Sequence, residues 1–269
     1  MNTELAKRWQ TALVALPVLF LIIYGSFSFI VLVLMASILC MYEFCGIVLK
    51  DTPITHEVCI LGFILTPVWI LTLHMGYSEY VWIIPVINLL IAAAITVFRF
   101  QHSPDIIETI TRQITGLIYI PGLLCFLVLI RQFENGHFWI YLSFMMVFAC
   151  DTGGYFVGKK FGKHPLCKAV SPKKTIEGFL GGCILCIITC LIFASLFGLP
   201  IPIEHMIGLS LVVGIFAPLG DLFESVLKRV SDIKDSGNIL PGHGGILDRI
   251  DALMFAGPLI YGYKILFIG

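Results

Sequence analysis

The sequence contains little charge. Only 13% of its 269 residues are Asp, Glu, Lys or Arg, whereas 58% are hydrophobic, and the mean hydropathy is +0.98. A soluble domain carries more charge on its surface, so the composition excludes an ordinary water-soluble protein. Net charge is absent too, because 17 basic residues balance 17 acidic ones, and no nucleic-acid partner is expected. The composition predicts an integral membrane protein whose main partner is the lipid bilayer.

Long apolar runs fill most of the chain. A helix needs about 20 mostly apolar residues to cross the bilayer core. This criterion predicts about nine spans, near residues 10–25, 27–48, 57–74, 80–98, 114–131, 138–157, 177–198, 204–227 and 250–267. Only Gly25 and Ser26 separate the first two, so one long first span is an alternative. The predicted fold is an all-α polytopic membrane protein.

The positions of Lys and Arg predict the orientation of the chain. Cytoplasmic loops of membrane proteins collect these residues. With nine spans and a cytoplasmic N-terminus, all 17 basic residues except Arg131 and Lys264 fall on the cytoplasmic side. We therefore expect the N-terminus to lie in the cytoplasm.

Charged residues concentrate in the C-terminal part of the chain. Residues 1–150 are expected to form N-terminal transmembrane helices, and residues 151–269 a transmembrane catalytic region with its site on the cytoplasmic side. Glu43 is the only acid well inside a predicted span of the first part. A carboxylate that reaches water at a helix end and a functional carboxylate remain equal alternatives for it.

Two segments rich in glycine and lysine precede or open the seventh predicted span. After Asp151, Gly153 and Gly154 permit either close helix packing or close approach of a phosphate to the backbone. Lys173 and Lys174 lie at a predicted helix N-terminus, where positive charge is unfavourable unless an anion binds. This mismatch favours a bound phosphate group, and anchoring of the lysines at lipid head groups is the alternative.

Residues 220–251 bring acids and bases to two predicted helix ends. Asp248 and Asp251 share one face of the last span by their i, i+3 spacing. Carboxylates in such positions suit Mg2+, which takes one or two of them together with substrate phosphates. A structural salt-bridge network is the alternative. Spacing of i, i+3, i+4 and i+7 puts four further polar residues on one face of the preceding span: Asp221, Glu224, Ser225 and Lys228.

This segment resembles the signature of the phosphatidate cytidylyltransferases, also called CDP-diacylglycerol synthases. The resemblance covers 27 positions in fixed order and spacing, which makes it highly specific. Residues 151–182 are also similar to an upstream block of that family, whereas residues 1–150 resemble it only in being polytopic. The matching signature residues are Ser225, Lys228, Arg229, Lys234, Asp235, Gly237, Pro241, His243, Gly244, Gly245, Asp248, Arg249 and Asp251.

The resemblance implies a reaction in which CTP and phosphatidic acid give CDP-diacylglycerol and pyrophosphate, at the cytoplasmic face of the inner membrane. Both substrates are anionic, so metal ions and basic side chains must offset their repulsion. The implied ligands of Mg2+, and of a second cation if one binds, are Asp221, Asp248 and Asp251. The implied catalytic residues, most of which would hold phosphate groups or stabilise pyrophosphate, are Lys228, Arg229, Lys234, Asp235, His243 and Arg249. Substrate contacts are expected from Asp151, Gly153, Gly154, Lys173, Lys174, Glu177 and Ser225.

Several alternatives remain open at this stage. His243 either donates a hydrogen bond to a phosphate or only orders its turn. A transporter or channel is the main alternative function, since intramembrane acids often carry ions or protons. A CTP-dependent lipid kinase or a CDP-alcohol phosphotransferase is another, although the Asp-Gly-x-x-Ala-Arg pattern of the phosphotransferases is not found. The small residues Gly178, Gly181 and Gly182 suit packing either within the chain or in a homodimer.

Overall fold

The fold is described from a computed structural model, for residues 25–49, 52, 56–101, 105–199, 201–239 and 244–268. Within these residues eight helices are long and apolar enough to cross a membrane. This confirms the predicted all-α polytopic fold, and each predicted span from residue 27 onward corresponds to one of the eight. The first predicted span, near 10–25, lies almost entirely outside the described residues. The cytoplasmic position of the N-terminus stays a prediction.

The chain divides into two compact units. Residues 1–129 and 231–248 form the first unit, and residues 130–230 and 249–269 form the second. The segment 231–248, which links two helices of the second unit along the chain, therefore belongs to the first. The division predicted at residue 150 concerned where the chemistry lies, and it stays a prediction.

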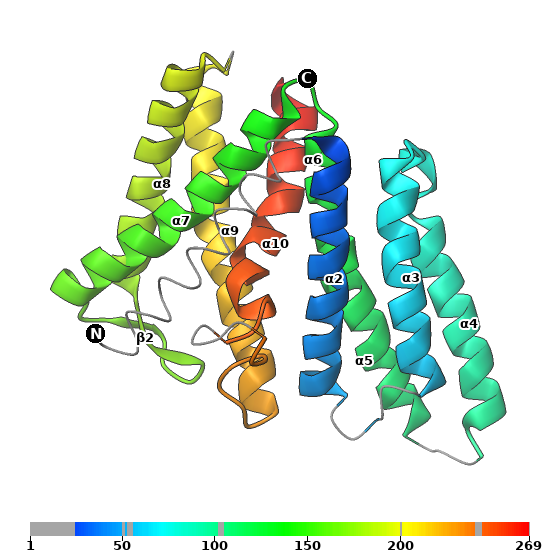
Figure 1. Ribbon diagram of the computed structural model, residues 1–269. Coiled ribbons are helices and arrows are strands. Elements are labelled where there is room, and N and C mark those ends of the chain that lie inside the picture. Colours follow the sequence, from blue (N-terminus) through cyan, green and yellow to red (C-terminus); the bar gives the residue numbers. More distant parts are fainter. Residues whose placement is uncertain are drawn as a thin grey trace, which may run out of the picture. The chain divides into compact units, whose positions relative to one another are not determined.

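The first unit is a bundle of apolar helices (Figure 1). Its helix α3 packs against α2, α4 and α5. The amides of Asn88 and Gln113, both almost fully buried, exchange hydrogen bonds of 3.2 and 3.1 Å between α4 and α5, so that neither is left unsatisfied among apolar side chains. The elements of this unit are α2 (Ser26–Val48), α3 (Glu57–His74), the short 3-10 helix η1 (Ser78–Tyr80), α4 (Ile83–Arg99), α5 (Ile106–Tyr119) and α6 (Pro121–Arg131).

One predicted span of the first unit is made of two consecutive helices. The apolar run predicted near 114–131 continues from α5 into α6, with a break at Ile120. Pro121 is the first residue of α6, a position that suits proline because no N–H is required there. The proline therefore marks the end of one helix and the start of the next.

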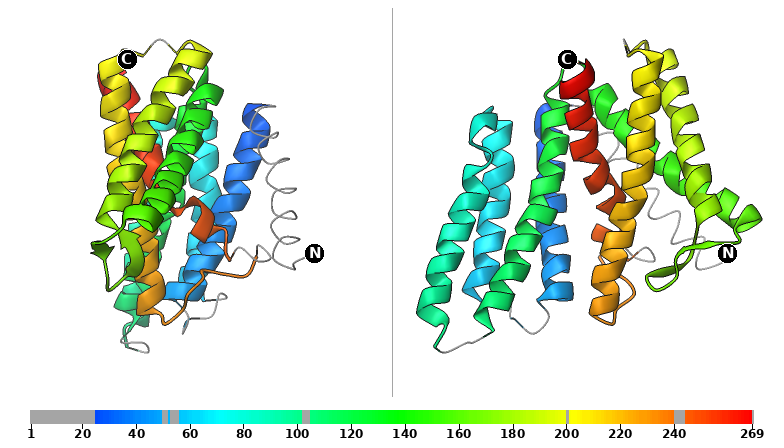
Figure 2. Two further views of the ribbon diagram at one scale, coloured as in Figure 1. Left: turned by 90° about the vertical axis from the view of Figure 1, so that its left-hand side faces the viewer. Right: turned by 180° about the vertical axis from the view of Figure 1, so that it is seen from behind.

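The second unit contains three long helices packed side by side and a small β-hairpin (Figure 2). Helix α8 packs against both α7 and α9. Strands β1 and β2 pair antiparallel, with Pro165 opposite Thr175. The sequence pattern did not predict this hairpin. The elements are α7 (Gly136–Phe161), β1 (Pro165–Cys167), β2 (Ser171–Thr175), α8 (Ile176–Phe197), α9 (Ile203–Val230), α10 (Leu247–Tyr263) and the π-helical turn η2 (Lys264–Ile268).

Glycines allow α7 and α8 to approach closely. A Cβ atom added at Gly153 would lie 2.6 Å from the carbonyl oxygen of Gly181, and one at Gly182 would lie 2.7 Å from that of Cys150. Both distances are too short for a real Cβ, so any larger residue would push the two helices apart. Helix packing is thus the role that the structure shows for Gly153.

Candidate active site

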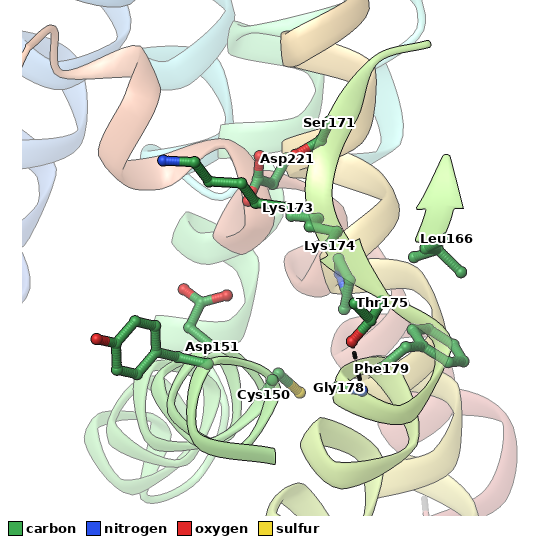
Figure 3. A pocket seen from close by; sticks show the side chains of 13 residues that line it. Cys150, Asp151, Leu166, Ser171, Lys173, Lys174, Thr175, Gly178, Phe179 and Asp221 are labelled. Carbon is green, nitrogen blue, oxygen red and sulfur yellow. Dashed lines mark hydrogen bonds and ion pairs between the residues drawn. The ribbon is translucent and has the colours of Figure 1, made fainter. Parts of the chain in front are cut away.

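A cavity of about 390 Å³ lies in the second unit, where α7, β2, α8 and α9 meet (Figure 3). Figure 3 shows the Asp151 side chain pointing from α7 toward the strand that carries Lys173 and Lys174. Five of the predicted substrate-contact or metal-ligand positions therefore line one cavity, together with largely apolar neighbours: Asp151, Gly154, Lys173, Lys174 and Asp221. Gly153 is buried in the α7–α8 contact and is not among the lining residues.

An ion pair joins two of the predicted site residues in this cavity. The Lys174 ammonium lies 2.6 Å from the Asp221 carboxylate, and the side chains keep 27% and 35% of their surface exposed. The Ser225 hydroxyl donates a longer hydrogen bond, of 3.4 Å, to the same carboxylate. A partly exposed pair of this kind contributes at most about 1 kcal/mol. A phosphate group can therefore replace Asp221 as the partner of Lys174 at little cost.

Three carboxylates of the second unit share one electrostatic environment. Asp151, Asp221 and Asp251 repel one another, and Lys174 attracts both Asp151 and Asp251. Asp251, on α10, is only 6% exposed, and its carboxylate accepts a 2.8 Å hydrogen bond from the backbone N–H of Ala252. Carboxylates close enough to repel one another are stabilised by positive charge placed among them.

The carboxylate oxygens of this group are ligands of the kind that suit a hard cation such as Mg2+. Among the described residues, no group of three or more His, Cys, Asp or Glu side chains is arranged as a complete metal site. Mg2+ does not require one, because it binds through one or two carboxylates and completes its shell with substrate phosphates and water. Asp221 lines the cavity, and Asp251 lies outside its lining. A role of either carboxylate in binding Mg2+ stays a prediction.

A buried ion pair on α9 involves another predicted site residue. The Lys228 ammonium lies 2.5 Å from the Glu224 carboxylate, and both side chains are largely buried. Sequence reasoning placed Glu224 on the same helix face but assigned it no role. The structure shows that it offsets the charge of Lys228 in an apolar environment. The phosphate contact predicted for Lys228 stays a prediction.

The hairpin is tied to the start of α8. One oxygen of Glu177 accepts hydrogen bonds from the backbone N–H groups of Lys163 and His164, at 3.1 and 3.2 Å, and the other lies 2.6 Å from Nδ1 of His164. Arg229 on α9 donates to the carbonyl oxygen of Val170, at 3.4 Å. Glu177, predicted to contact substrate, is thus positioned to hold the loop beside the cavity.

Of the remaining signature residues, Arg249 belongs to the second unit, and the others lie in the first unit or outside the described residues. Lys234 and Asp235 are exposed, whereas His243 lies outside the described residues. One carboxylate oxygen of Asp248 accepts three hydrogen bonds of 2.9 Å, from the backbone N–H and the hydroxyl of Ser236 and from the N–H of Gly245. Asp248, a predicted metal ligand, therefore also organises its own loop.

Sequence reasoning did not assign a role to two residues of this loop network. Ser236 lies between signature positions, and its hydroxyl contacts Glu43 as well as Asp248. Glu43 comes from α2, far away in the sequence, and is 3% exposed. The sequence did carry one signal for Glu43: it is the only acid well inside a predicted span of the first 150 residues, and such acids are often functional.

Comparison with known proteins identifies the family of the chain. A model of the cytidylyltransferase family matches residues 6–267. The chain is 34% identical over 261 residues to a phosphatidate cytidylyltransferase of Bacillus subtilis (strain 168), covering 95% of each chain. It is 46% identical over 127 residues to a phosphatidate cytidylyltransferase of Staphylococcus aureus (strain COL), covering 47% of this chain and 48% of the relative. The match extends through the N-terminal helices, which the signature alone did not cover.

A membrane-embedded nucleotidyltransferase is the class of enzyme that these observations define. The chain belongs to the cytidylyltransferase family.

Proposed function

We propose that this enzyme transfers the cytidylyl group of CTP to phosphatidate, producing CDP-diacylglycerol and pyrophosphate. The observation that carries the proposal is the joint presence of lysines and carboxylates around one cavity in a chain that bears the 225–251 signature. The relatives that match the chain are named for this activity. A transporter would need its ionisable groups on a path through the membrane, whereas the lysines of this cavity come from a hairpin between two spans.

Electrostatic attraction accounts for binding of the anionic substrates. Lys173 is exposed at the cavity, and Lys174 exchanges its weak pairing with Asp221 for a phosphate oxygen. The apolar lining residues and the surrounding spans accept the diacylglycerol part of phosphatidate. The cavity therefore serves a reaction between a lipid and a soluble nucleotide.

The chemical step requires positioning and charge stabilisation from this chain. An oxygen of the lipid phosphate attacks the α-phosphorus of CTP; the new P–O bond forms as the bond to pyrophosphate breaks. No general base is needed, because phosphatidate is already ionised near neutral pH. Mg2+, for which the family resemblance implies Asp221, Asp248 and Asp251 as ligands, would neutralise the phosphate charges. Lys228, Arg229, Lys234 and Arg249 stabilise the departing pyrophosphate.

The proposal also includes the side of the membrane. Lys173, Lys174 and the neighbouring basic residues follow the positive-inside rule if the hairpin faces the cytoplasm, where CTP is available. The active site is thus proposed to open to the cytoplasmic face of the inner membrane.

Pyrophosphate release by detergent-solubilised protein tests the function. We expect release only when CTP, phosphatidic acid and Mg2+ are all present, and loss of release in Asp221→Asn. Asp232→Asn is the matched control, because Asp232 is exposed and its backbone φ of 56° is tolerated by Asn. CDP or CMP as the soluble product would instead indicate a lipid kinase or an alcohol phosphotransferase. No nucleotide product from folded protein, with ion flux in vesicles, would refute the proposal.

A further inference from the structure

A carboxylate from the N-terminal helices reaches the signature segment within the first unit. Glu43 lies near the end of α2 and is 3% exposed. One of its oxygens accepts a hydrogen bond from the N–H of Ile246, at 3.0 Å, and the other from the N–H of Leu247, at 2.8 Å. These residues are 203 and 204 positions away from Glu43 in the sequence. The contact therefore ties the start of α10 to a helix that carries none of the predicted site residues.

A single hydroxyl group connects Glu43 to Asp248. The Ser236 hydroxyl lies 3.1 Å from a Glu43 oxygen and 2.9 Å from an Asp248 oxygen. It has only one proton for the two carboxylates, so each depends on further donors. Glu43 receives the N–H groups of Ile246 and Leu247, and Asp248 those of Ser236 and Gly245. The two carboxylates thus share one hydrogen-bond network that orders both sides of the segment.

Glycines of the signature make room for this network. A Cβ atom at Gly237 would lie 2.6 Å from a Glu43 oxygen, and one at Gly245 would lie 2.5 Å from the other and closer still to the Ser236 hydroxyl. At Gly244, where φ is +80°, a Cβ atom would lie 2.7 Å from the Asp248 carboxylate. Small residues at these positions are required because the backbone passes directly against the two carboxylates.

We propose that Glu43 is a positioning residue for the reaction: it holds residues 236–239 and 244–248 against α2 and thereby sets the direction of the Asp248 carboxylate. Glu43 does not touch substrate in this role. It acts through Ser236 and the backbone of Ile246 and Leu247. The inference rests on the proposed function only in that Asp248 takes part in turnover. It makes the N-terminal helices part of the catalytic machinery rather than a membrane anchor alone.

The conservative substitution Glu43→Gln tests this role sharply. Each Glu43 oxygen accepts a backbone N–H, so either orientation of the amide places its NH2 group against a donor, Ile246 or Leu247. The shape of the side chain is kept while one acceptor is lost. Gln113→Leu is the matched control, because it also removes a buried hydrogen-bonded group of the first unit but does not contact the segment.

Two measurements on the full-length protein separate positioning from general stability. Hydrogen exchange followed by mass spectrometry, without substrates or Mg2+, should show amides of 244–248 exchanging at least about tenfold faster in Glu43→Gln than in wild type or Gln113→Leu. Kinetics of pyrophosphate release should show, in Glu43→Gln but not in Gln113→Leu, at least about a tenfold lower kcat and a higher Mg2+ concentration for half-maximal rate. Ser236→Ala should likewise speed the exchange of 244–248 and impair the kinetics. It replaces Glu43→Gln in the experiment if Glu43→Gln does not fold.

The outcomes are distinguishable. Unchanged exchange in 244–248 overturns the proposal, because Glu43 then does not hold the segment. Faster exchange with unchanged kcat and Mg2+ dependence also overturns it, because the segment would then not depend on Glu43 for the reaction. An equal loss of kcat in Gln113→Leu would show that the effect comes from stability alone, and this result also overturns the proposal. If the wild-type protein releases no pyrophosphate, the proposed function fails, and the exchange experiment still decides whether Glu43 holds the segment.

Discussion

Gly153 and Gly154 are adjacent in sequence, yet the structure predicts opposite effects of adding a methyl group. At Gly153 an added Cβ would lie 2.6 Å from the carbonyl oxygen of Gly181 and 3.0 Å from two further backbone atoms of α8. These atoms cannot rotate away as a side chain would. At Gly154 the nearest atom is a carbonyl oxygen of Gly178 at 3.7 Å, an ordinary contact. Gly153→Ala must therefore displace α7 from α8, whereas Gly154→Ala need not.

The magnitude follows from two opposing terms. Replacing Gly by Ala inside a helix favours the helix by about 1 kcal/mol, and this gain is common to both variants. Overpacking a close contact costs about 1–3 kcal/mol, and this cost applies only to Gly153→Ala. Their difference in unfolding free energy is therefore about 1–3 kcal/mol. At roughly 2–4 °C per kcal/mol for a chain of about this size, Gly153→Ala should melt about 2–12 °C below Gly154→Ala.

Thermal unfolding of both variants in the same detergent, followed by intrinsic fluorescence, measures this difference. Because the gain in helix stability from replacing Gly by Ala is the same in both variants, their difference in Tm reports only on the α7–α8 contact. Equal Tm values, or a lower Tm for Gly154→Ala, would refute the argument that backbone contact at Gly153 limits side-chain size. Activity is a separate readout, since Gly154 lines the cavity and Gly153 does not.

Two further predictions concern ion pairs. Glu224→Ala should lower the unfolding free energy by about 3–5 kcal/mol, because it leaves the buried Lys228 ammonium without its carboxylate; the double variant with Lys228→Met should recover most of the loss, and thermal melts of both check this. Glu177→Ala should speed tryptic cleavage after Lys163, because the carboxylate holds the backbone there and His164 beside it. Cleavage at the wild-type rate would leave Glu177 with only the substrate contact that the sequence predicts.

The sequence predicted the spans and the chemistry of the C-terminal region because both depend on local patterns. Long apolar runs identify membrane helices wherever they pack, and the eight described helices confirm them. The signature at 225–251 indicated the family, which the match over residues 6–267 confirms. The hairpin was not predicted because the residues of β2, such as Lys173 and Thr175, carry no alternating apolar pattern. This strand forms by pairing with residues 165–167, and Glu177 holds the adjoining backbone of His164.

Some roles depended on contacts between distant parts of the chain. The glycines of α7 were compatible with either phosphate binding or packing, and only the facing backbone of α8 distinguishes Gly153, which packs, from Gly154, which lines the cavity. Likewise a lone acid at position 43 was compatible with solvent exposure or with function. Its burial against Ile246 and Leu247 is visible only in the folded chain.

By itself, the sequence determined the membrane location, the helical fold and the family, because hydrophobic length and motif spacing are properties of consecutive residues. Tertiary structure alone decided which distant polar groups meet: Lys174 with Asp221, and Glu43 with the signature segment. The physical reason is that a buried charge must find partners within about 3 Å, and the partners available at that distance depend on packing rather than on sequence order.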